Sequence, residues 1–218
     1  MKPKFWLERW QNNQIGFHQT EHNPLLQEFW HHLCLPTDAA VFVPLCGKSL
    51  DMHWLAAQGH SVVGVELAQL AVEQFFAEEK LVTQQVVDRF IQFSNGQTSV
   101  FLGDFFDLTS ELVGNTEGVF DRGGLVALPP DMRFRYVDHM LRIIPEGARI
   151  LLLTLEYDQS LVDGPPHSVE QAEVERLYGQ RCEIALLDAY VTATLPPHFQ
   201  AQNITQAVES VYLITKKD

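Results

Sequence analysis

Basic residues are scarce in this chain of 218 residues, and cysteine is rarer still. The 15 Lys and Arg side chains are outnumbered by 28 Asp and Glu, so the formal net charge is −13. This deficit argues against nucleic acid or an anionic membrane as the main partner, because both need a clustered basic face. It leaves room for a small anionic substrate, which needs only one or two local cations.

Cys34, Cys46 and Cys182 lie far apart and form no C-x-x-C motif. They indicate neither a zinc site nor a disulfide framework, and such an odd, small number suits a reducing cytoplasm. The histidines do not predict a metal site either, because no third histidine or carboxylate lies at a convincing spacing from His18 and His22. We therefore predict no metal, and we expect Cys46 to be a packed loop residue rather than a nucleophile.

Long apolar runs are also missing. The longest, such as ILLLTL, have the length of a strand and fall far short of a membrane span of about 20 residues. The N-terminal sequence MKPKFWLERWQNN lacks the apolar core of a signal peptide. No repeat or linker divides the chain. We therefore expect a cytoplasmic monomer with one domain over residues 1–218, of which residues 1–38 form an N-terminal extension rich in aromatic residues and histidine.

Short apolar runs alternate with segments of helical periodicity, which predicts an α/β fold with a mostly parallel sheet. Helices are expected within residues 49–59, 68–80 and 131–144, and the apolar side of the last is expected to hold Phe134, Val137, Met140, Leu141 and Ile144. No helical pattern separates the last two strand candidates, so they are expected to be antiparallel neighbours at a sheet edge. Seven runs are expected to form strands, and they begin at Ala40, His60, Thr98, Gly118, Ala148, Cys182 and Glu209.

The tripeptide Gly47-Lys48-Ser49 follows the first expected strand, and a phosphate-binding P-loop ends in the same way. A P-loop needs another glycine five positions before Gly47, but Phe42 stands there, inside the strand. Without that glycine the backbone amides cannot curl around a triphosphate. The motif therefore does not indicate a nucleoside triphosphatase.

Glu66 closes the second expected strand, 19 residues after Gly47. An acid at this spacing is placed to accept hydrogen bonds from the ribose hydroxyls of an adenosine-type cofactor. The G-x-G-x-x-G fingerprint is missing, which disfavours NAD and FAD because their pyrophosphate needs a close backbone approach. S-adenosylmethionine carries adenosine without phosphates and fits better. The alternative is that Glu66 merely ends a strand at the surface.

Five ordered segments that span nearly the whole chain resemble the thiopurine S-methyltransferase family, and its bacterial branch most. They are FWLERWQNNQIGFHQ, VPLCGKSLDMHWLAAQGHSVVGVE, GDFFDL, FDRGGLVALP and LEYDQSLVDGPPHSV. The resemblance implies a Rossmann-like, seven-stranded, mostly parallel sheet with helices on both faces. It also implies an antiparallel strand near the C-terminus and an N-terminal helical lid. The implied reaction moves the methyl group of S-adenosylmethionine to the sulfur of a thiopurine or another aromatic or heterocyclic thiol, giving S-adenosylhomocysteine.

The resemblance also implies cofactor-binding residues. Trp10 matches a tryptophan that covers the cofactor, and Leu45 matches a loop residue that packs against it. Glu66 matches the ribose-binding acid. Asp104 and Phe105 match a pair that contacts the adenine in relatives.

On the acceptor side, Phe17 matches an aromatic residue at the boundary with the cofactor, and Arg122 an arginine near both ligands. Taken alone, Arg122 has an alternative role in a salt bridge with Asp121 or Asp104. His167 stands where the family more often has an apolar residue. No general base is implied, because thiopurine thiols are acidic enough to ionise near neutral pH.

Several alternatives stay open at this level. Trp6 and Trp10 share one helix face, so they either pin the N-terminal segment to the core or close an aromatic lid over the sulfonium, or do both. The methyl acceptor is a thiol in one alternative, and a selenium, tellurium, arsenite or halide species in the other. Outside the enzymes, the alternative is a non-catalytic protein that binds S-adenosylmethionine.

Overall fold

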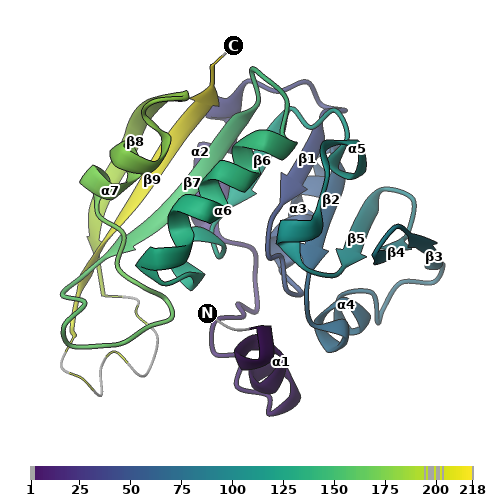
Figure 1. The fold of residues 1–218 in the computed structure, drawn as a ribbon, viewed down its shortest axis with the longest axis horizontal. Coiled ribbons are helices and arrows are strands. Elements are labelled where there is room, and N and C mark those ends of the chain that lie inside the picture. Colours follow the sequence, from purple (N-terminus) through teal and green to yellow (C-terminus); the bar gives the residue numbers. More distant parts are fainter. Residues whose placement is uncertain (1–2, 194, 196–198, 200–201, 203, 218) are drawn as a thin grey trace.

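A continuous nine-stranded sheet runs through the molecule in the order β3-β4-β5-β2-β1-β6-β7-β9-β8 (Figure 1). The computed structural model describes residues 3–193, 195, 199, 202 and 204–217. The strands are β1 (Ala40–Val43), β2 (Ser61–Glu66), β3 (Thr83–Val87), β4 (Phe90–Ser94), β5 (Thr98–Leu102), β6 (Gly118–Asp121), β7 (Arg149–Glu156), β8 (Cys182–Thr192) and β9 (Ala207–Lys216). The helices are α1 (Pro3–Gln11), α2 (Pro24–Phe29), α3 (Leu50–Ala57), α4 (Gln69–Phe75), α5 (Ser110–Val113), α6 (Pro130–Ile143) and α7 (Gln171–Tyr178), with short 3-10 turns η1 (Trp30–Leu33), η2 (Phe105–Asp107) and η3 (Leu125–Ala127).

The five central strands, β5, β2, β1, β6 and β7, are parallel, as expected. The antiparallel pairing of the last two strands is also confirmed, and β9 lies between β7 and β8, antiparallel to both. The count of seven strands is wrong, because the hairpin of β3 and β4 extends the sheet beyond β5. The sequence TQQVV of β3 is almost entirely exposed, so it carries no apolar pattern from which a strand is predicted.

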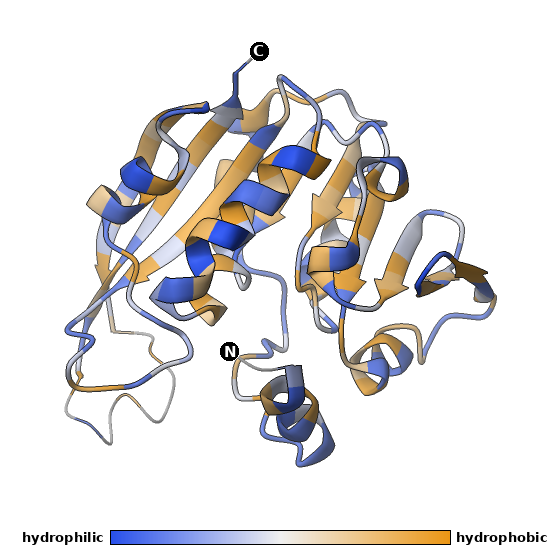
Figure 2. Cartoon of the chain, viewed as in Figure 1, coloured by the Kyte–Doolittle hydropathy of each residue, from blue (hydrophilic) through white to orange (hydrophobic). Residues whose placement is uncertain are grey.

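Helices cover both faces of the sheet. Successive side chains of a strand point to opposite faces, so Phe42 packs under α6 while Val41 and Val43 pack against the layer of α2 and α3. Figure 1 shows α6 and α7 on the near face, with α2 and α3 behind the strands. The strands are apolar along most of their length, and the polar side of α6 faces outward (Figure 2). A parallel sheet that is covered on both faces has this composition.

The inner face of α6 contains Val137 and Met140, as expected, but the expectation for Phe134 is wrong. Buried Arg133, Tyr136, Val137 and Met140 follow the helical spacing of the face that meets the sheet, whereas Phe134 is 67% exposed. Phe134 lies one position beyond Arg133, so its side chain points about 100° away from that face. The guanidinium of Arg133 reaches the carbonyl of Leu128 and the carboxylate of Glu173, which explains how a charge is accommodated there.

The N-terminal helix α1 lies beyond the carboxyl ends of the central strands, away from both helical layers (Figure 1). It contacts α4 through Trp10, which packs on Ala68 and Ala71. In an open α/β sheet, the edge where the strands end is where ligands bind. The fold therefore places an aromatic helix directly over the expected site.

Candidate cofactor and acceptor site

The loop after β1 is curled by two residues in the left-handed backbone region. Leu45 has φ 46° and Gly47 has φ 56°, and the amide of Cys46 donates to the carbonyl of Val65 at 3.0 Å. This conformation directs the Gly47 amide toward the end of β2. A Cβ on Gly47 would also lie 3.3 Å from the ring of Trp10, so glycine meets both a conformational and a steric requirement.

Glu66 ends β2 with its carboxylate buried at this loop rather than free at the surface; the residue is 7% exposed. Its Oε2 accepts from the Gly47 amide at 2.9 Å, and its Oε1 accepts from the Ala68 amide at 2.7 Å. Burial raises the pKa of Glu66, while the backbone hydrogen bonds act to lower it. Each carboxylate oxygen has further acceptor capacity, so Glu66 is held rigidly and can still accept hydrogen bonds from hydroxyl groups.

Aromatic rings from the N-terminal segment lie over the loop. Trp10 is 4% exposed. Its ring meets that of Phe17 edge-to-face, with 5.7 Å between the ring centroids, and the ring of Trp6 also meets Phe17 edge-to-face, at 5.6 Å. Phe17 itself is 39% exposed. Trp10 therefore pins the N-terminal segment to the core next to α4, and its ring also lies against the Gly47 loop. Trp6 is only partly buried.

A cavity of about 510 Å³ opens beside Trp10. The pairing of β2 with β5 sets Glu66 opposite Leu102, which brings the ends of both strands to this cavity. Its volume falls in the range of small-molecule sites. The lining residues are Leu7, Trp10, Gln11, Leu67, Ala68, Gln69, Leu70, Glu73 and Leu102.

The predicted adenine pair occupies the loop after β5. Asp104 accepts from the amide of Phe106 at 3.0 Å and caps the short turn η2. The ring of Phe105 is 2% exposed and lies 4.8 Å from that of Tyr136 and 6.5 Å from that of Phe42. The Phe105 side chain is thus a core element, and neither residue lines the cavity.

Arg122 follows β6, and its partner is neither of the two acids considered from the sequence. Its Nη2 lies 3.0 Å from Oδ2 of Asp51, a carboxylate on the first turn of α3. Asp51 is 2% exposed, whereas the Arg122 side chain is 21% exposed. Sequence reasoning missed Asp51, because the pattern Ser-Leu-Asp at a helix start is typical of ordinary capping and carries no link to Arg122.

Asp121 instead shapes the turn that carries Arg122. Its Oδ1 accepts from the amides of Gly124 and Leu125 at 3.0 and 3.1 Å, and its Oδ2 accepts from the Tyr136 hydroxyl at 2.9 Å. Burial raises the pKa of the Asp121 carboxyl. These bonds fix the backbone of the turn, so the base of the Arg122 side chain has a defined position.

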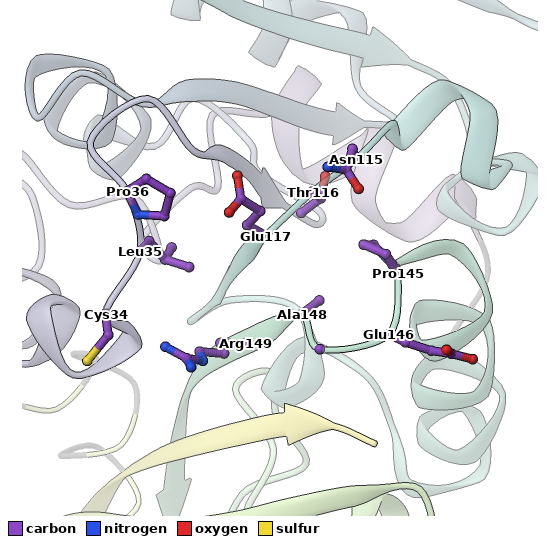
Figure 3. Close-up of a pocket in the computed structure, with 11 residues that line it drawn as sticks. Cys34, Leu35, Pro36, Asn115, Thr116, Glu117, Pro145, Glu146, Ala148 and Arg149 are labelled. Atoms are coloured by element: carbon purple, nitrogen blue, oxygen red, sulfur yellow. The ribbon is translucent and has the colours of Figure 1, made fainter. Parts of the chain in front are cut away.

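A second cavity, of about 310 Å³, lies at the amino ends of the central strands, where β1, β6 and β7 begin (Figure 3). Glu117 and Arg149 line it, together with the exposed Cys34. The Arg149 guanidinium is already used, because it donates to the carbonyl of Leu33. Ligands of open α/β sheets bind at the carboxyl ends of the strands, so the cavity beside Trp10 is the better candidate.

The described part of the chain contains no group of three His, Cys, Asp or Glu residues able to hold a metal ion. His22 Nε2 donates to the side-chain oxygen Oε1 of Gln27 at 3.2 Å, and the His22 ring stacks on Trp54 rather than pairing with His18. Within the same residues, no helix is long and apolar enough to cross a membrane.

Comparison with known proteins identifies the family. The model of the family described as thiopurine S-methyltransferase matches residues 1–217. The chain belongs to the thiopurine S-methyltransferase family. A relative named thiopurine S-methyltransferase from Nitrosospira multiformis is 46% identical over 98% of this chain and 98% of its own length. A relative of the same name from Methylococcus capsulatus is 44% identical over 97% of this chain and 96% of its own.

Solved structures show the same fold at much lower identity. The 1,6-didemethyltoxoflavin-N1-methyltransferase of Burkholderia thailandensis, solved with S-adenosylhomocysteine, has a TM-score of 0.64 at 15% identity, covering 99% of this chain and 87% of that one. A SAM-dependent methyltransferase from Anabaena variabilis has a TM-score of 0.65 at 12% identity, covering 99% and 95%. This member of the thiopurine S-methyltransferase family therefore has the Rossmann-like fold of S-adenosylmethionine-dependent methyltransferases.

Proposed function

We propose that this protein transfers the methyl group of S-adenosylmethionine to the sulfur of a thiopurine or another aromatic or heterocyclic thiol, with S-adenosylhomocysteine as the second product. The observation that carries the proposal is the buried Glu66 carboxylate, held against the Gly47 loop, with the residues that follow it, Leu67 and Ala68, lining the open cavity beside Trp10. The names of the relatives point to the same acceptor class.

The residues around the cavity fit an adenosine-type cofactor. Glu66 has spare acceptor capacity for two ribose hydroxyls, and the adjacent cavity has the volume and the apolar walls that a planar base requires. Glycine at position 47 leaves room between loop and lid that a Cβ would fill. We assign cofactor contacts to Trp10, Leu45 and Glu66, with Arg122 beside them.

The loop of Asp104 and Phe105 is assigned to the adenine end of the site. The Phe105 ring is packed in the core, so its share in binding comes from the backbone and from fixing the loop. Asp104 holds that loop by capping η2. This assignment leaves Leu67 and Leu102, which line the cavity, as the apolar contacts to the base.

The bound cofactor supplies an activated methyl group on a positive sulfonium. Trp10 and Phe17 present aromatic faces that favour a nearby cation and keep water out of the transfer region. Arg122 holds the anionic group of the acceptor with the guanidinium donors that Asp51 does not use. Orientation of this kind can contribute about 7–11 kcal/mol to a reaction barrier. No side chain needs to act as a general base when the thiol is already ionised.

A panel of acceptors tests the proposal. The purified protein is incubated with methyl-labelled S-adenosylmethionine and with thiopurines, thiophenols and their hydroxyl analogues. Labelled thioethers are expected from the thiols and no product from the hydroxyl compounds. A headspace assay with selenite, tellurite, arsenite and halide detects volatile methylated products. Turnover of those species alone, or cofactor binding without turnover of any acceptor, would refute the proposal.

A further inference from the structure

Asp51 is a buried carboxylate that joins three separate parts of the chain. Its Oδ1 accepts from the backbone amide of Asn23 at 2.7 Å. Its Oδ2 accepts from the Ser49 hydroxyl at 2.7 Å and from Arg122 Nη2 at 3.0 Å. Both oxygens therefore accept hydrogen bonds, and the donors come from the N-terminal segment, the Gly47 loop and the turn after β6.

The burial of this charge calls for an explanation. A carboxylate removed from water is costly unless it is paired and hydrogen-bonded, and replacing such a pair by apolar residues is often neutral or stabilising. The stability of the fold does not by itself require a charged side chain at this position near the N-terminus of α3, where Asp51 is 2% exposed. What the arrangement does provide is a defined position for one end of the Arg122 guanidinium.

The geometry leaves Arg122 prepared for a ligand. Among the described residues, Asp51 is the single hydrogen-bond acceptor of its guanidinium, which has five N–H donors. The remaining donors keep a fixed direction because Nη2 is held and the turn is set by Asp121. A bidentate contact with an anionic acceptor depends on such a fixed fork.

Asp51 also reaches the segment that carries the aromatic lid. Asn23 is 4% exposed and caps α2, where its Oδ1 accepts from the Leu25 amide at 2.9 Å. This is the point at which the chain leaves the loop of Phe17 and enters the core. His18 on that loop lies near Arg122 and Asp51, and its pKa is lowered first by partial burial and then by the charges of Lys48 and Arg122.

We propose that Asp51 is a positioning residue that orients Arg122 toward an anionic acceptor and couples this orientation to the seating of the N-terminal segment. The inference rests on the proposed function, in which Arg122 contacts the acceptor. Loss of the Asp51 charge frees the guanidinium to adopt other rotamers, so acceptor binding weakens even though the local positive charge increases. Cofactor binding depends on Glu66 and is left nearly unchanged.

A double-mutant cycle tests this role with Asp51→Asn, Arg122→Ala and the combination. Asparagine keeps the size of the side chain and can still accept from Asn23, so its main effect is removal of the charge. In Asp51→Asn we expect acceptor KM to rise by about tenfold, the size of one charge-assisted hydrogen bond, with the Kd for S-adenosylhomocysteine unchanged within twofold. When Arg122 is already alanine, adding Asp51→Asn is expected to leave acceptor KM equal to that of the Arg122→Ala variant.

Glu173→Gln serves as a matched control, because it removes the charge from another buried ion pair, that with Arg133. It is expected to lower Tm without changing acceptor KM. An equal loss of acceptor affinity in the control, a fall in KM in Asp51→Asn, or an undiminished effect of Asp51→Asn without Arg122 would each overturn the positioning role. A wild-type protein that turns over no thiol would instead refute the proposed function. In that case KM cannot be measured, and the effects of Asp51→Asn and Arg122→Ala are compared through the Kd of a thiopurine, measured by calorimetry in the presence of S-adenosylhomocysteine.

Discussion

Glu66→Ala is the substitution with the sharpest expected effect on the cofactor. A hydrogen bond to a charged group contributes about 1.5–3 kcal/mol. Loss of two ribose hydroxyl bonds therefore corresponds to about 3–6 kcal/mol, which is roughly a hundred- to ten-thousand-fold in Kd. The fold is also affected, because the amides of Gly47 and Ala68 lose their acceptors at 2.9 and 2.7 Å. Each unpaired buried amide costs about 1–3 kcal/mol of unfolding free energy.

Calorimetry with S-adenosylmethionine and S-adenosylhomocysteine measures the first effect, at a temperature where melting curves show both proteins folded. Glu117→Gln is the control, because Glu117 lies at the amino ends of the central strands, at the opposite end from Glu66. It is expected to bind the cofactor like the wild type. An unchanged cofactor Kd in folded Glu66→Ala would refute the assignment of Glu66 to the ribose.

The pH dependence of binding follows from the same carboxyl. Burial raises the pKa of Glu66 above its ordinary value of 4.5. Between the two values the folded state binds more protons than the unfolded chain, so the contribution of Glu66 to stability falls as pH rises through this window. Cofactor affinity has the opposite dependence, because the ionised carboxylate is the stronger acceptor. We expect calorimetric affinity to increase as pH rises through the raised pKa, and this step to be missing in Glu66→Gln.

Three further substitutions test the remaining parts of the site. Arg122→Ala is expected to raise acceptor KM by about ten- to a hundredfold, the loss of a charge-assisted contact, with a smaller change in cofactor Kd; steady-state kinetics with a thiopurine would contradict this if KM stayed constant. Gly47→Ala is expected to lower stability by about 1–2 kcal/mol and to weaken cofactor binding, because its φ is 56° and its Cβ would crowd Trp10 at 3.3 Å; an unchanged Tm by calorimetry would show that the loop adapts. Trp10→Ala is expected to cost about 3–5 kcal/mol of unfolding free energy and to weaken the cofactor as well. A loss of stability with no change in Kd would leave Trp10 as a core residue alone.

The α/β class, the central parallel strands and the antiparallel end followed from local patterns in the sequence. A strand that is buried on both faces needs a continuous apolar run, and a helix on a sheet needs an apolar stripe, so both leave marks within a few residues. The position of Glu66 was also predictable. Its spacing from Gly47 spans the rest of the loop, the helix α3, a turn and the strand β2, whose lengths are set by the fold.

Other features were decided only by the tertiary structure. The exposed strand β3 has no apolar pattern, because its stability comes from pairing with β4 rather than from burial. The direction of the Phe105 ring, into the core rather than toward the cavity, depends on the packing of α6 against β1. No local pattern encodes either one.

The ion pair of Arg122 and Asp51 joins positions that are 71 residues apart. Their meeting depends on β6 lying beside β1, so that the turn after one strand faces the helix after the other. The sequence by itself determined that an acid at position 66 and an arginine at position 122 stand at strand ends. Only the strand order and register, which arise from long-range packing of both sheet faces, decided which partners these side chains meet.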